Sequence, residues 1–129
     1  MAVYVSDYLQ SGKPALGGSY SGLLVQVARV DLTSALAVND EIELFPIDGT
    51  AKMFRLSITE NGTAITGAFA NLVHEDANGN RTTLLSGIGE GVYTLYDLAP
   101  PSDGKLLLVA TATSTGATQI VVGLEIYYD

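Results

Sequence analysis

The chain has 129 residues and no cysteine, a length that fits one domain and a composition that excludes disulfide frameworks, thiol catalysis and thiolate metal sites. Six Lys and Arg residues against 14 Asp and Glu residues give a net charge of −8, and the basic residues are scattered, so we expect binding neither to nucleic acid nor to an anionic membrane surface. Apolar residues make up 47% of the chain, which argues against disorder, and the longest apolar run, at 106–110, is too short to span a bilayer.

Residues 1–20 differ in composition from the rest of the chain, because glycine or proline stands at 12, 14, 17 and 18 and tyrosines at 4, 8 and 20 are spaced through the segment. Tyrosine is common at interfaces because it joins apolar area to a hydroxyl. We interpret residues 1–20 as an N-terminal arm that contacts a partner, and expect that deletion of residues 2–18 leaves the fold intact. The candidate contact residues are Tyr4, Tyr8, Leu16 and Tyr20. An edge strand followed by a loop is the alternative interpretation.

Alternation of apolar and polar residues predicts strands along the rest of the chain. The expected strands lie at 22–32, 40–45, 51–59, 64–75, 91–98, 105–114 and 118–129. Phe54, Leu56 and Ile58 are expected to share one face, and the face of 118–129 that holds Leu124 is expected to be buried.

Turn signals such as Asn-Gly and Asp-Gly separate these strands at short intervals. The best helical candidates, 33–38 and 68–74, are short. The pattern predicts an all-β, single-domain antiparallel β-sandwich over residues 21–129, with a jelly roll as the favoured form.

The only histidine, His74, is the first candidate for catalysis. A serine hydrolase needs a nucleophile beside such a base, and the nearest approach to a Gly-x-Ser-x-Gly elbow, at 18–22, has Tyr20 at its centre. His74 is therefore interpreted as a surface or packing residue.

The run Asp76, Asn78 and Asn80 begins like a calcium-binding loop. That loop requires glycine at its sixth position and glutamate at its twelfth, but Arg81 and Gly87 stand there. A hairpin turn centred on Asn78 and Gly79 is the preferred interpretation.

Glu41 and Glu43 lie two residues apart on one expected strand, so their side chains share a face. A cation site or a glycosidase-like pair is one interpretation, and a solvated acidic face that discourages aggregation is the favoured one. With neither a phosphate-binding loop nor a zinc spacing, we expect no enzyme activity, no cofactor and no metal ion.

Residues 32–62 resemble a run found in small structural proteins of tailed double-stranded DNA phages. The parts that carry the resemblance are a strand at 39–44, a turn with Pro46 and Gly49, a strand from Phe54 to Ile58 and a turn at 60–62. The ending at 118–129, a strand that closes in Tyr and Asp, is also similar, so the resemblance covers roughly residues 21–129.

The resemblance implies a capsid decoration (cement) protein with a jelly-roll or similar β-sandwich fold. Such a protein would form a homotrimer, bind the major capsid protein on the outer surface of the virion, and be made in the host cytoplasm. Two alternatives stay open. One is a head–tail connector, tail or fibre-base module. The other is a carbohydrate-binding β-sandwich or small hydrolase, in which exposed aromatic rings would hold the sugar. Its candidate residues are Tyr93, Tyr96, Tyr127 and Tyr128.

Overall fold

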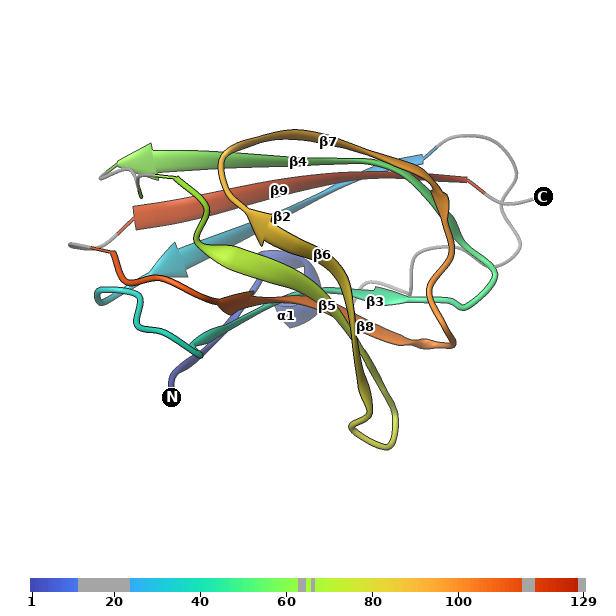
Figure 1. The fold of residues 1–129 in the computed structure, drawn as a ribbon, viewed down its shortest axis with the longest axis horizontal. Helices are drawn as coiled ribbons and strands as arrows, with labels where there is room; N and C mark the ends of the chain where they lie inside the picture. Colours follow the sequence, from blue (N-terminus) through green and yellow to red (C-terminus); the bar gives the residue numbers. More distant parts are fainter. Residues whose placement is uncertain (12–23, 63–64, 66, 115–117, 128–129) are drawn as a thin grey trace.

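Two β-sheets face each other in the computed structural model, which describes residues 1–11, 24–62, 65, 67–114 and 118–127 (Figure 1). Over these residues the chain forms nine strands and one short helix. In chain order they are β1 (Val3–Val5), α1 (Asp7–Gln10), β2 (Leu24–Leu32), β3 (Glu41–Ile47), β4 (Lys52–Gly62), β5 (Ala70–Asp76), β6 (Arg81–Ile88), β7 (Gly91–Leu98), β8 (Gly104–Ala110) and β9 (Thr118–Tyr127).

The order of the strands in the two sheets is that of a jelly roll. One sheet has the order β2-β9-β4-β7, and the other has the order β1-β3-β8-β5-β6. From β2 to β9 every connection crosses between the sheets, except for the β5–β6 hairpin. Eight strands connected in this way form a jelly roll, to which β1 is added parallel to β3. The predicted all-β antiparallel sandwich and its jelly-roll form are therefore confirmed.

Alternate residues of the central strands build the core between the sheets. In β9, which lies between β2 and β4, Ile120, Val122, Leu124 and Ile126 are all 0% exposed. The residues between them point to the other face of the sheet, because side chains alternate along a strand. The predicted inward face of 118–129 is thus confirmed for the described residues, and Tyr128 lies outside them.

A β-bulge reverses the predicted face of one residue in β4. In its pairing with β9, β4 shifts register between Met53 and Arg55, which lie opposite the adjacent residues Ile126 and Glu125, so Phe54 is the extra residue. Met53 is fully buried, whereas Phe54 is half-buried and its ring centroid lies 5.2 Å from the guanidinium of Arg55. Leu56 and Ile58 face the core as predicted, and the placement of Phe54 beside them was wrong.

Residues 1–11, the described part of the predicted arm, pack on the body of the domain. β1 pairs with β3, and the Ser6 hydroxyl caps α1 and donates to the carbonyl of Leu44 at 2.5 Å. Tyr8 is 3% exposed and its ring meets that of Phe45 edge to face, with centroids 5.1 Å apart. This part of the chain follows the alternative interpretation, an edge strand. We now expect deletion of residues 2–18 to destabilise the fold.

One strand of the fold was not predicted from the sequence. β6 was not expected, because Thr, Ser and Gly give it neither an apolar stripe nor clear alternation. β5 confirms a strand within the expected range 64–75, so the weak helical candidate at 68–74 is not a helix, and the one at 33–38 is irregular. In β5 and β6 the pairing with neighbouring strands outweighs a weak local preference.

Candidate functional site

The predicted partner contacts divide between the core, a partly exposed position and residues outside the described part of the chain. Tyr8 lies in the core, and Tyr4 is half-buried, with its hydroxyl 2.9 Å from that of Ser34. Leu16 and Tyr20 lie outside the described residues. The buried ring of Tyr8 offers a partner no surface in this conformation, and the role of the other residues as contacts stays a prediction.

His74 is a packing residue of β5. Its side chain is 1% exposed, and Nε2 lies 2.9 Å from the carbonyl oxygen of Ser102, to which it donates. Gly104 allows this approach, because a Cβ there would lie 2.9 Å from His74 Nε2 and 2.2 Å from the carbonyl oxygen of Glu75. The ring therefore ties β5 to the loop before β8, and the atom it meets is a main-chain acceptor rather than a nucleophile.

The run from Asp76 to Asn80 forms the predicted hairpin turn between β5 and β6. Asp76 Oδ1 accepts the amides of Asn78 and Asn80, each at 2.9 Å, and Oδ2 accepts the Asn80 side chain at 3.1 Å. Gly79 supplies the positive φ of 84° that the turn needs. The hydrogen bond from the main-chain amide of Asn80 is the main reason why the pKa of Asp76 is lowered. Both carboxylate oxygens are thus engaged in holding the turn.

A network of charges crosses the outer face of the five-stranded sheet. Arg81 pairs with Glu41 at 2.9 Å and with Glu75 at 2.7 Å, and Lys105 pairs with Glu43 and, at 3.2 Å, with Glu75. The side chain of Glu41 is only 9% exposed, so the predicted solvated face was wrong for this residue. The hydrogen bond from Arg81 is the main cause that lowers the pKa of Glu75.

This network covers an apolar layer of its own. Val73 and Leu107, at 5% and 0% exposure, are buried but lie outside the main core cluster. They pair with each other across β5 and β8. The carboxylates above them are compensated by basic groups, so the network is suited to fastening four strands together rather than to proton transfer. Among the described residues, no group of three or more His, Asp or Glu side chains is placed to hold a metal ion.

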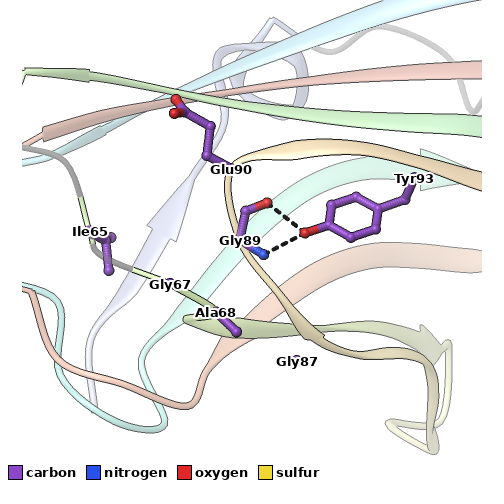
Figure 2. A pocket seen from close by; sticks show the side chains of 7 residues that line it. All are labelled: Ile65, Gly67, Ala68, Gly87, Gly89, Glu90 and Tyr93. Carbon is purple, nitrogen blue, oxygen red and sulfur yellow. Dashed lines mark hydrogen bonds between the residues drawn. The ribbon is translucent and has the colours of Figure 1, made fainter.

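A hollow of about 370 Å³ lies beside β7, where much of its lining is glycine backbone (Figure 2). Tyr93 Oη accepts the amide of Gly89 at 2.9 Å and donates to its carbonyl at 3.1 Å. Gly89 packs so closely on Gly67 that a Cβ would lie 2.5 Å from the Gly67 oxygen. Glu90, the lining carboxylate, accepts the amide of Glu60 at 2.8 Å. The polar side chains of the hollow thus serve the fold, and they do not include a nucleophile with a base.

The tyrosines considered for carbohydrate binding differ in placement. Tyr93 packs against the core cluster, whereas Tyr127 follows the inward-facing Ile126 and so belongs to the opposite face of its sheet. Tyr96 is 85% exposed at a positive φ of 51°, and Tyr128 lies outside the described residues.

Comparison with known proteins shows that the fold of this chain is similar to that of other solved structures. No protein-family model matches the sequence, and no curated protein matches it. A chain in the capsid of Ralstonia phage GP4 superposes with a TM-score of 0.65 at 20% identity, over 99% of this chain and 99% of that one. This chain shares its fold with phage capsid chains. A chain of the cyanophage Pam1 capsid gives a TM-score of 0.62 at 14% identity, over 91% and 93% of the two chains.

A third match comes from the acid-stable capsid of Helicobacter pylori bacteriophage KHP30, with a TM-score of 0.50 at 13% identity over 83% and 88% of the two chains. At these identities the likeness shows the fold. It spans the jelly roll as a whole rather than a local motif. In the described residues no helix is long and apolar enough to cross a membrane.

Sequence reasoning missed the residues that bind the N-terminal segment to the body. Asp40 accepts the amides of Ala2 and Ala37, each at 2.8 Å, and Asp7 accepts the amide of Arg29 at 2.7 Å. A signal was present, because Ser6 followed by Asp7 is a common start of a helix. The contact of Asp40 with Ala2, by contrast, joins residues 38 positions apart, which no local pattern reveals.

Proposed function

We propose that this chain is a non-enzymatic structural protein of a phage virion, a decoration (cement) protein that binds the outer capsid surface and stabilises the shell. The observation that carries the proposal is the likeness to the GP4 capsid chain, which covers 99% of both chains. Neither chain has a large unmatched part, so the likeness covers the whole jelly roll rather than a local motif.

The charge of the chain supports a place on the outside of the shell. A net charge of −8 opposes contact with packaged DNA, whose phosphates are also negative. A protein that binds the assembled shell but not free subunits stabilises the shell by mass action. The partner in this proposal is the major capsid protein, and three copies of this chain assemble on the shell as a homotrimer around a three-fold axis.

The N-terminal segment is the proposed grip on the capsid. Tyr4 is half-buried at the edge of the five-stranded sheet, so part of its ring is available to a neighbour. Leu16 and Tyr20 complete the proposed contact, and residues 21–129 form the body that carries it. Tyr8 is left out of this contact, because its ring fills the core beside Phe45.

The proposal is tested by adding the purified protein to expanded shells that lack it, made from the phage that encodes it. Co-sedimentation with the shells and a higher temperature of shell disassembly are the expected results. Protein that stays in the supernatant and leaves shell stability unchanged would overturn the proposal. Binding to isolated tails or connectors instead of shells would support the alternative location in the virion.

A further inference from the structure

Edge strands carry unpaired amides and carbonyls that invite another chain to pair, and proteins usually block them. The edges of the two sheets are β1, β6, β2 and β7. β1 is three residues long, and the Gln10 side chain donates to the carbonyl of Val5 at 2.8 Å. β6 shifts register twice along β5, and β7 is bent at Tyr96 and Asp97, which have φ values of 51° and 63°. Each of these three edges is thus poorly shaped for adding a strand.

β2 differs from the other three edges. Its nine residues pair one to one with β9, from Leu24 opposite Ile126 to Leu32 opposite Thr118, without a shift in register. The amide of Arg29 donates to Asp7 Oδ1 at 2.7 Å, so it faces the open edge rather than β9. Because hydrogen-bonding direction alternates along an antiparallel pair, the amides of Val25 and Val27 face the open edge as well.

The side chains at this edge are apolar and exposed. Val25 is 58% exposed and Val27 is 37% exposed. Residues 24–28, Leu-Val-Gln-Val-Ala, carry no charge, although the chain as a whole has a net charge of −8. A second copy of the same segment is therefore a partner that brings no like charges into contact.

We propose that β2 pairs antiparallel with β2 of a second copy around a two-fold axis at Gln26. Asp7 already occupies the amide of Arg29, and within the described residues the outward amides of Val25 and Val27 have no such partner, so they can exchange hydrogen bonds with a second copy. The two-fold axis sets Val25 opposite Val27 of the second copy and Gln26 opposite Gln26. Both apolar pairs become cross-strand neighbours, and two four-stranded sheets join into one continuous sheet.

The size of this contact sets its strength. Five residues a side is far fewer than the roughly 20–30 a side of a stable interface, so the free protein associates weakly and only at high concentration. A surface that holds many copies close together would raise the effective concentration and populate the contact. This last step rests on the proposed function, whereas the pairing itself is a property of the free protein.

The pairing is tested in the purified full-length chain, which has no cysteine of its own. In the variant Gln26→Cys the two engineered thiols face each other across the two-fold axis, within the short Cα separation that a disulfide needs. We expect oxidation to yield a disulfide-linked dimer. The matched control Asp31→Cys is exposed on the same strand, but lies five residues from the axis and so stays monomeric in the same gel.

A second variant removes the hydrogen bond without a cross-link. Val27→Pro deletes an amide that faces the open edge and leaves the bonds to β9 in place, whereas Val27→Thr keeps both the amide and the branched shape. Sedimentation equilibrium of the wild type and Val27→Thr should show the particle mass doubling between micromolar and millimolar concentration, and Val27→Pro should not double.

If Val27→Pro fails to fold, amide hydrogen exchange of the wild type gives the same test, because Val25 and Val27 should gain protection as concentration rises. Equal cross-linking of both cysteine variants, or a wild-type mass that stays constant to millimolar concentration, overturns the inference. Shell binding by a protein that never doubles would remove this contact and leave the proposed function standing.

Discussion

Truncation of Tyr8 to alanine tests whether the N-terminal segment is a detachable arm or an integral part of the fold. The ring is 3% exposed and lies edge to face on Phe45. Removing a buried aromatic side chain of this size costs about 3–5 kcal/mol, of which the ring–ring contact accounts for about 0.5–1.5 kcal/mol. Domains of this length lose about 3–4 °C in Tm per kcal/mol, so Tyr8→Ala should lower Tm by roughly 10–20 °C.

Denaturation in urea, followed by circular dichroism, measures the effect on the free energy of unfolding, with an unchanged m value as the sign that the fold itself is kept. Val3→Ala is the matched control, because Val3 lies in the same segment but is 48% exposed, and its cost should stay within about 0.5 kcal/mol. If Tyr8→Ala is as stable as Val3→Ala, residues 1–11 are a detachable arm and the packing argument fails.

Three further predictions concern the body of the domain. Leu124→Asp should prevent folding, because it places an unpaired charge where the side chain is 0% exposed, whereas Val92→Asp, at a position 66% exposed, should melt near the wild-type temperature. The hydrogen bond from Arg81 lowers the pKa of Glu75 below 4.5, so the stability that ionised Glu75 contributes is present at neutral pH and is lost as pH falls through the lowered pKa. Glu75→Gln should therefore flatten the acid limb of a plot of Tm against pH, and an unchanged limb would contradict this. Gly104→Ala should destabilise the fold strongly in a thermal melt, since its Cβ would lie 2.2 Å from the carbonyl oxygen of Glu75, and a wild-type Tm would refute that close approach.

The fold was predictable where one face of a strand is buried, because burial then dictates the sequence at every second residue. β9 is the clearest case, and the alternation around Leu124 predicted its inward face correctly. The hairpin turn at Asn78 and Gly79 was equally predictable, since a turn that needs a positive φ favours glycine. These two local signals are enough to indicate a sandwich of short strands.

The rest depends on contacts between residues far apart in the sequence. The bulge at Phe54 arises from the pairing of β4 with β9, so alternation within β4 alone gave the wrong face. The compensation of Glu41 by Arg81 requires knowledge of the strand order, without which the acidic pair looked solvated. Tyr8 looked like an interface residue, because an amphipathic ring suits a core and a contact surface equally well.

The central claim, a place on the outer surface of a phage capsid, is tested most directly by cryo-electron microscopy of virions of the phage that encodes this chain. The account predicts density for the two-sheet jelly roll on the outside of the shell, in contact with the major capsid protein and repeated over the shell. Density for this fold at the tail or the connector alone, or its absence from the virion, would contradict the account.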